Sequence, residues 1–187
     1  MRERWGTTFG VVCLCLAALS ADCFGAVVTV DASATAALQN PEAATERRLL
    51  LRFDVPERLS AGIVELAMVE FRTAFSAADS TADVALDCFE ITTPWSAGTA
   101  DWTESWTTPG GDLDRMRHGV CTAAVSDTSL VRFDVTDMVA GWAADAAANH
   151  GVIVAVAPKE SAYIATLRGA ELRRARLKIW YTPRRDG

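Results

Sequence analysis

The chain has 187 residues, of which half are apolar, with 18 basic and 24 acidic side chains and a formal net charge of −6. This length suits one domain of ordinary size with a real hydrophobic core. An acidic chain without a dominant basic stripe argues against nucleic acid as its main partner.

Residues 1–25 are predicted to be a secretory signal peptide. Two arginines within the first four residues precede an apolar stretch at 9–19, and small residues follow it. That order is typical of a signal peptide. The apolar stretch is too short for a membrane-spanning helix, which needs about 20 residues. We expect a secreted, extracellular or periplasmic protein without a membrane span. The alternative, a lipoprotein modified at Cys23, is disfavoured by Asp22 directly before it.

The rest of the chain is predicted to be built from short β-strands. Roughly nine apolar runs of strand length recur, and many begin or end at Gly, Pro, Asp or Asn. They lie at residues 26–30, 48–55, 62–75, 84–92, 119–125, 129–135, 151–157, 163–169 and 174–182. They predict an all-β fold, an antiparallel β-sandwich formed as a single domain over residues 26–183, with a short tail at 184–187.

Alternation of side chains assigns faces in two of these strands. In the strand at 62–75 it groups Val64, Leu66 and Met68 on one face. In the strand at 174–182 it separates Leu177, Ile179 and Tyr181 from Lys178 and Trp180.

The tetrapeptide RFDV occurs twice, at residues 52–55 and 132–135. In both copies the Phe lies on the face opposite the Arg. The Asp stands where the chain leaves the strand, a position from which it can accept backbone N–H bonds. The residues that follow the two copies differ, so we interpret them as two analogous strand-to-turn corners rather than as a duplication.

One segment has the pattern of a helix. The Ala-rich stretch at 136–147 is predicted to form a short helix across one end of the sandwich. Thr136 suits its N-cap and Gly151 its end. Trp142 falls at helical spacing with its apolar neighbours, so we expect it to pack inward.

A long, polar, Trp-rich stretch at 92–119 is predicted to be a large ordered loop, a kind of segment that tends to be functional or disordered. Trp95, Trp102 and Trp106 in this loop allow two interpretations. Their flat faces can stack on the apolar C–H faces of sugars and so form a glycan-binding platform. Alternatively, they pin the loop onto the sandwich, since large aromatic side chains bury the most area.

Two cysteines, Cys88 and Cys121, remain outside the predicted signal peptide. In an oxidising compartment a lone pair of cysteines indicates a disulfide, which we predict here. The alternative is two buried thiols.

Acidic side chains near the end of the loop raise the question of calcium. Asp112 and Asp114 lie in GGDLD, and Asp101 and Glu104 lie upstream. Carboxylates on extracellular loops are common Ca²⁺ ligands, so a structural calcium site is one interpretation. The spacing is not that of an EF-hand, and an acidic turn with glycine is the alternative. No other cofactor is predicted.

The sequence contains no catalytic motif. It lacks G-x-S-x-G, a P-loop and any Cys/His metal spacing, and it has only two histidines. Paired acids such as Asp101 and Glu104 could hydrolyse glycosides only if the fold brought them to the required separation. We therefore predict no catalytic residues and no enzyme activity.

Four stretches resemble one known family. They are LLLRFDVPERLSAGIVELAMVEF at 49–71, PWSAGTADWTESWTTP at 94–109, FDVTDMVAGWAADAAANHGVIVAV at 133–156 and ARLKIWYT at 175–182. Together they resemble the secreted bacterial DNRLRE-type domains, most specifically in the F-D-V-T…W…N-x-G run. One departure is Ala175, where the family often has Pro.

The resemblance implies a jelly-roll-like β-sandwich without catalytic activity. Relatives of this family include modules that bind polysaccharides, alginate among them. We therefore expect a secreted module that binds polysaccharide or glycan at the cell surface or matrix. The alternative is a structural or assembly module that docks onto other extracellular proteins, and a polysaccharide-acting enzyme is a third hypothesis.

Overall fold

A computed structural model describes residues 25–43, 46–74, 83–124, 128–156 and 174–184. The predicted signal peptide, apart from Gly25, and the predicted strand at 163–169 lie outside the described residues.

The described residues form eight strands, one α-helix and two short 3-10 turns. The strands are β1 (Ala26–Gln39), β2 (Arg47–Phe53), β3 (Gly62–Ala74), β4 (Asp83–Ile91), β5 (Leu113–Ala124), β6 (Thr128–Asp134), β7 (Val152–Val156) and β8 (Arg176–Pro183). The helix is α1 (Thr136–Ala144), and the turns are η1 (Glu57–Leu59) and η2 (Ala146–Ala148).

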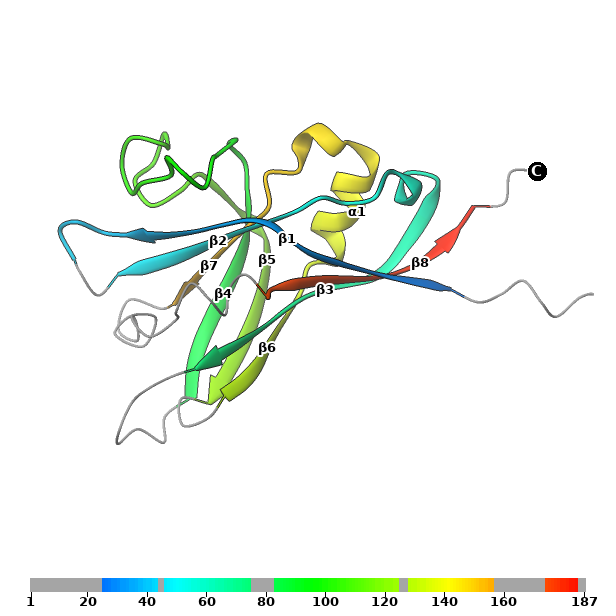
Figure 1. The fold of residues 1–187 in the computed structure, drawn as a ribbon, viewed down its shortest axis with the longest axis horizontal. Coiled ribbons are helices and arrows are strands. Elements are labelled where there is room, and N and C mark those ends of the chain that lie inside the picture. The colour runs from blue at the N-terminus through cyan, green and yellow to red at the C-terminus, as the bar shows by residue number, and fades with distance from the viewer. Residues whose placement is uncertain (1–24, 44–45, 75–82, 125–127, 157–173, 185–187) are drawn as a thin grey trace, which may run out of the picture.

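The strands pair in the order β5-β4-β7-β2-β1-β8-β3-β6, with antiparallel pairing throughout. Strand β1 pairs with β8 through its first half and with β2 through its second half. The pairing of β1 with β2 shifts register between Ala32 and Ala34. Strands that pass from one sheet to another commonly do so at such irregularities. Figure 1 shows β1 running from one part of the sheet into the other.

Strand β1 thus joins two layers. We call β2, β7, β4 and β5 the β2 layer, and the first half of β1 with β8, β3 and β6 the β1 layer. Apart from β4 and β5, strands next to each other in a layer are not consecutive in the chain, as in a jelly roll. The predicted all-β, jelly-roll-like sandwich with one short helix is confirmed.

The main core lies between the two layers. Leu49, Leu51 and Phe53 of β2 point into it and are fully buried. From the β1 layer come Ala67, Val69, Phe71, Val131, Phe133, Leu177 and Ile179. The predicted separation of Leu177, Ile179 and Tyr181 from Lys178 and Trp180 is confirmed, since only the first set packs in this core.

The β2 layer is also buried on its outer face. Leu50 points away from Leu49 and Leu51, and it belongs to a second apolar cluster on that face. Register aligns it with Ala36, Ile153 and Phe89 in one row across four strands. A strand buried on both faces explains the unbroken run of three leucines in the sequence.

The helix begins as predicted but ends earlier. Its N-cap is Val135 rather than Thr136, whose hydroxyl oxygen accepts a bond from Ala67 N at 3.0 Å. Its last residue is Ala144, so the prediction that Gly151 ends the helix is wrong. The inward packing of Trp142 is confirmed, with 1% of the residue exposed.

The face assignment in β3 is partly wrong. Register shifts between Val64 and Leu66 against β8, so Glu65 forms a bulge. An extra residue in a strand moves the following side chains to the other face. Val64 therefore packs against the core, while Leu66 is exposed on the outer face of the strand. Met68 lies on the same face as Leu66.

Both RFDV copies stand at strand ends, as predicted. Strand β2 ends at Phe53 and β6 at Asp134. The Asp134 carboxylate accepts the backbone N–H of Thr136 at 3.0 Å, which fixes the start of α1. Asp54 instead accepts the hydroxyl of Ser33 at 2.9 Å.

Candidate functional site

The Trp-rich segment between β4 and β5 folds over the outer face of the β2 layer (Figure 1). Trp95, Trp102 and Trp106 are only 6%, 8% and 8% exposed. They pack against Leu38, Leu50, Ile91 and Ile153. The three indoles therefore anchor the loop, as in the second of the two interpretations of the sequence, and their faces do not form an exposed platform for sugar stacking.

Two arginines of β2 contact this loop from the sheet beneath it. The Arg48 guanidinium lies 4.9 Å from the ring centroid of Trp102, and Arg52 lies 5.5 Å from that of Trp95. Arg48 Nη1 also donates to the carbonyl of Gly110 at 2.7 Å. A cation over an indole face stabilises both groups and occupies that face.

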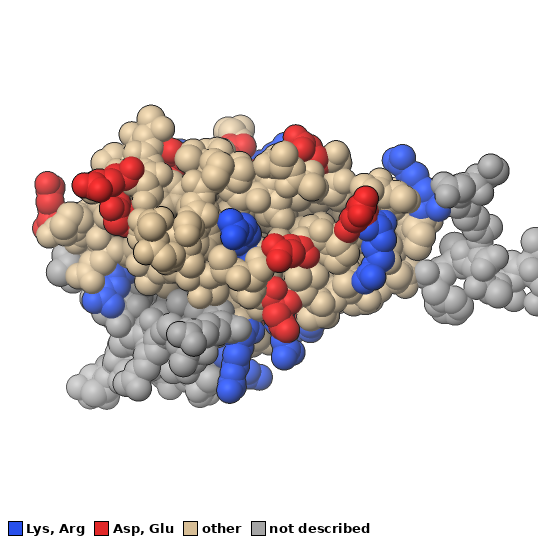
Figure 2. Space-filling view, turned by 45° about the horizontal axis from the view of Figure 1, so that its top comes forward, with Lys and Arg blue, Asp and Glu red and all other residues tan. Residues whose placement is uncertain are grey.

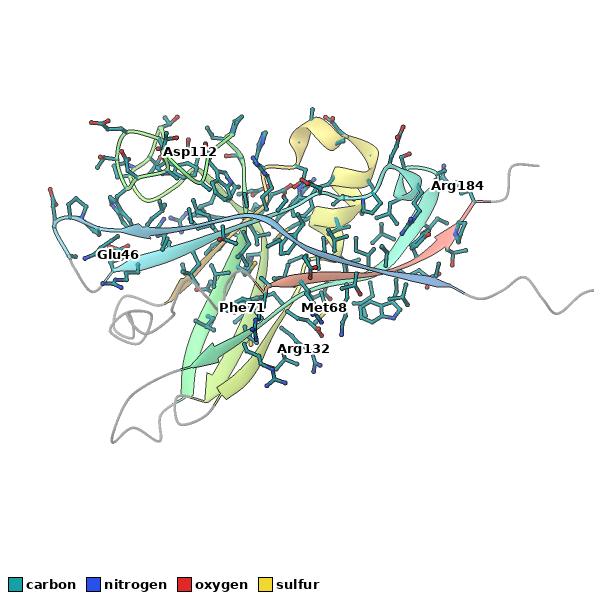
Figure 3. The ribbon with its side chains drawn as sticks, in the orientation of Figure 1. Glu46, Met68, Phe71, Asp112, Arg132 and Arg184 are labelled. Carbon is teal, nitrogen blue, oxygen red and sulfur yellow. The ribbon has the colours of Figure 1, made fainter. Side chains whose placement is uncertain are left out.

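Asp112 organises the end of the loop (Figure 3). Its carboxylate accepts the Thr93 hydroxyl at 2.9 Å and the backbone N–H groups of Thr107 and Thr108 at 2.9 and 2.8 Å. Burial raises the pKa of Asp112, but these hydrogen bonds outweigh it and leave the pKa below its ordinary value. The carboxylate thus ties β4 to the loop.

The other predicted calcium ligands also serve the loop or its neighbours. Asp114 Oδ1 accepts the N–H of Met116 at 2.8 Å. Asp101 Oδ1 accepts the backbone N–H groups of residues 103–105 at 2.8, 2.6 and 3.4 Å. Within the described ranges no three acids, histidines or cysteines gather where they could hold a metal ion. The structure does not bring these acids together, and calcium binding stays an untested prediction.

No disulfide joins Cys88 to Cys121, so that prediction is wrong for this structure. The register of β4 and β5 places Cys88 opposite Gly119, and Cys121 opposite Leu86. The two cysteines are diagonal neighbours, and such residues lie about 7–8 Å apart, beyond the usual span of a disulfide. Burial raises the pKa of the Cys88 thiol, which disfavours its reactive thiolate form.

A cleft of about 400 Å³ lies between β5 and the start of α1. Its polar lining residues include His118, Asp134 and Asp137. Asp134 holds the first turn of α1, and His118 stacks on Phe89 with ring centroids 5.7 Å apart. The contacts of these two side chains are therefore structural.

A second groove, of about 340 Å³, lies beside the loop at the β1–β2 turn, where Figure 3 labels Glu46. Asn40, Glu42, Glu46, Arg48, Trp102 and Thr103 line it with Pro41 and Pro109. Asn40 Nδ2 donates to Glu46 Oε2 at 2.8 Å, so the polar wall is internally ordered. Figure 2, which brings this loop toward the viewer, shows isolated charges on a largely uncharged surface.

The outer face of the β1 layer is open and carries a row of apolar side chains. Register aligns Val27, Trp180 and Leu66 across β1, β8 and β3. Val27 is 55% exposed and Leu66 is 37% exposed, while Trp180 is half-buried between them. Ile63, also 55% exposed, extends the apolar area toward the start of β3.

A charged ladder crosses the same face farther along the strands. Asp31, Arg176, Glu70 and Arg132 align across β1, β8, β3 and β6. Arg132 and Lys178 each contact Glu70 at 2.8 Å, and Arg176 contacts Asp31 at 3.3 Å. The hydrogen bond from Lys178 is the largest of the effects that lower the pKa of Glu70. Figure 3 shows Met68 and Arg132 on the side of β3 and β6 away from α1.

The two layers therefore differ in whether the loop covers their outer faces. The loop covers the apolar row of the β2 layer, whereas the row through Val27, Trp180 and Leu66 stays open. Contiguous exposed apolar area on a protein commonly marks an interaction surface. The alternation of β8 placed Trp180 on the outer face, but the row itself depends on cross-strand register, which was not predicted.

No family model matches the chain, and no curated protein matches it. No helix in the described part of the chain is long and apolar enough to cross a membrane.

Proposed function

We propose that the protein is a non-catalytic structural module of an extracellular assembly, and that it docks through the outer face of the β1 layer. The predicted signal peptide and the resemblance to secreted β-sandwich modules support the extracellular setting. The burial of the loop tryptophans favours assembly over glycan stacking.

One observation carries this proposal: the exposed row of Val27, Trp180 and Leu66. Burying an exposed apolar side chain of this size contributes about 1.5–3 kcal/mol. Charged residues flank the row on one side, as the polar rim of an interface flanks its apolar centre. Burial of the apolar row would supply affinity for a partner, and the flanking charges would fix how that partner is oriented.

The test compares two valines of similar exposure. Val27 lies on the proposed face, and Val120 lies on β5, with 55% and 61% exposed. Size-exclusion chromatography of freshly secreted material would report the native size of complexes that contain the protein. We expect the wild type and Val120→Asp to elute in a complex larger than the monomer, and Val27→Asp to elute as a monomer.

Both substitutions alter exposed positions, so each is expected to change stability by no more than about 0.5 kcal/mol. Thermal unfolding of the two variants would check this. A wild-type protein that elutes as a monomer, or a Val27→Asp variant that elutes like the wild type, would refute the proposed docking face.

Glycan binding is the second candidate function, favoured by the groove at the β1–β2 turn. There Asn40 and Glu46 line the groove with amide and carboxylate groups, together with Trp102. Sugar sites commonly combine planar hydrogen-bonding groups with an aromatic wall. Tryptophan fluorescence titrated with a polysaccharide panel that includes alginate would test it. A saturable change that is lost in Asn40→Ala supports this function, and the absence of any change counts against it.

A further inference from the structure

We infer that the partner of the β1-layer outer face is a second copy of this chain, packed in an isologous dimer with its twofold axis parallel to the strands. This inference rests on the docking face proposed above. It is carried by the order of charges on that face, which is complementary to itself when reversed.

The charged ladder on this face has no net charge, although the chain carries −6. Its two acids, Asp31 and Glu70, are balanced by its two bases, Arg176 and Arg132. Two acidic chains repel each other over most of their surfaces. They can approach through this face without that repulsion.

The signs in the ladder alternate. From β1 to β6 they run negative, positive, negative and positive, through Asp31, Arg176, Glu70 and Arg132. A twofold axis parallel to the strands, between β8 and β3, reverses the strand order in the second copy and keeps the position along the strands. Asp31 then faces Arg132 of the second copy, and Arg176 faces its Glu70.

The two central members of the apolar row obey the same symmetry, whereas Val27 lies opposite the residues that follow β6 in the second copy. Trp180 on β8 faces Leu66 on β3 of the second copy, and Leu66 faces the second Trp180. In the intervening row Lys178 faces Met68 of the second copy, and Thr29 faces its Asp134. The apolar centre thus meets an apolar centre, and Lys178 keeps Glu70 of its own chain as its partner of opposite charge.

A twofold axis across the strands gives a worse arrangement. It would lay the charged ladder of one copy over the apolar row of the other. Strand order is unchanged about such an axis, so Trp180 would cover Arg176 and Leu66 would cover Glu70, without a partner of opposite charge in the second copy, which is costly. The distribution of charges thus selects the axis parallel to the strands.

The twist of packed sheets is compatible with these pairs. Packed sheets cross at about 30°, and an outer strand of a four-stranded layer lies about 7 Å from the central axis. The rotation moves the outer pair by about 4 Å, about one residue along a strand. Aspartate and arginine side chains can span that displacement, so Asp31 and the second Arg132 remain within reach.

Sedimentation equilibrium of the purified secreted protein tests the inference through a charge exchange. Asp31→Arg and Arg132→Asp each place two like-charged pairs in the dimer, and each should raise the dissociation constant by about tenfold or more. The double variant D31R/R132D restores opposite charges and should bring it back to near the wild-type value.

This rescue is specific to contacts between copies. Within one chain Asp31 lies on β1 and Arg132 on β6, with two strands between them. Their own neighbours are Arg176 and Glu70, which the double variant leaves facing like charges. Glu104→Arg, an exposed change on the loop, is the matched control and should leave the dissociation constant unchanged.

A wild type that stays monomeric at its highest soluble concentration would overturn the inference, as would a double variant no tighter than the single ones. The proposal of a docking face and the inference of a second copy can be refuted independently. A monomeric purified protein, combined with a native secreted complex that Val27→Asp disrupts, would leave the docking face standing and replace the second copy by another protein.

Discussion

At the scale of single residues, the N-x-G run that carries the family resemblance has a structural role. Asn149 Nδ2 donates to the carbonyl of Phe53 at 2.8 Å, and Asn149 Oδ1 accepts the N–H of Gly151 at 3.2 Å. Asn149 therefore fastens the start of β7 to the first RFDV corner. Gly151 has φ of +87°, and a Cβ there would lie 2.2 Å from Leu51 O.

Gly151→Ala is expected to be strongly destabilising. The new methyl group would clash with the backbone of β2, in a conformation that side chains rarely adopt. We expect a loss of about 3 kcal/mol or more in the free energy of unfolding, measured by urea denaturation. Gly98→Ala is the control, since nothing lies within 4 Å of a Cβ at that position. Equal stability of the two variants would contradict the role given to Gly151.

Asp112 makes stability depend on pH. Its pKa is lowered in the folded protein, from an unfolded value of about 3.9. Its contribution is therefore present above about pH 4 and is lost as the pH falls through the folded pKa. Asp112→Asn should cost about 1–3 kcal/mol at neutral pH, because the amide group replaces one of the accepting oxygens.

Urea denaturation from pH 7 to pH 3 would measure the difference between the wild type and Asp112→Asn. The difference should shrink below about pH 4. Glu104→Gln, exposed on the same loop, is the matched control. A difference that stays constant over this range would show that the hydrogen bonds of the charged carboxylate do not hold the loop.

At the scale of elements, the sequence predicts which segments are strands better than how the strands pair. Apolar alternation was sufficient for β8, because that strand is regular. It failed in β3 because the bulge at Glu65 shifts the faces, and a bulge leaves no periodic signal. The disulfide prediction failed for a related reason. The register between β4 and β5 decides whether Cys88 and Cys121 are opposite or diagonal, and the sequence does not show that register.

The composition of the loop does not predict what its tryptophans contact. Its tryptophans are equally suited to stacking on sugars and to covering a sheet. The outer face of the β2 layer decides between the two, since Leu50 and Ile153 on that face need a cover. Only the three-dimensional arrangement shows that both faces of this layer are apolar.

Trp106→Ala is expected to loosen the loop and destabilise the domain. The indole packs in the second cluster, and its Nε1 donates to the carbonyl of Asp101 at 2.6 Å. Removal of a buried aromatic side chain costs about 3–5 kcal/mol. Thermal unfolding measures the loss, and Met116→Ala, at a side chain that is 89% exposed, should change little. If both variants melt like the wild type, the loop is not anchored by Trp106.

At the scale of the whole molecule, the two outer faces differ in what covers them within the described residues. One face is covered by a segment of the same chain, and the other presents an apolar row beside an alternating charged ladder. The sequence placed Trp180 outward but gave no means to align it with Val27 and Leu66, because these residues are distant along the chain. The candidate docking face is thus a product of strand order and register.

The most direct test of the docking face is oxidative footprinting of the secreted protein over a range of concentrations, read by mass spectrometry. Trp180 and Met68 lie on the face, and Met116 on β5 serves as an exposed internal reference. We expect the oxidation rates of Trp180 and Met68 to fall relative to that of Met116 as the protein assembles. Rates that stay in constant proportion, in a sample that does assemble, would contradict the docking face.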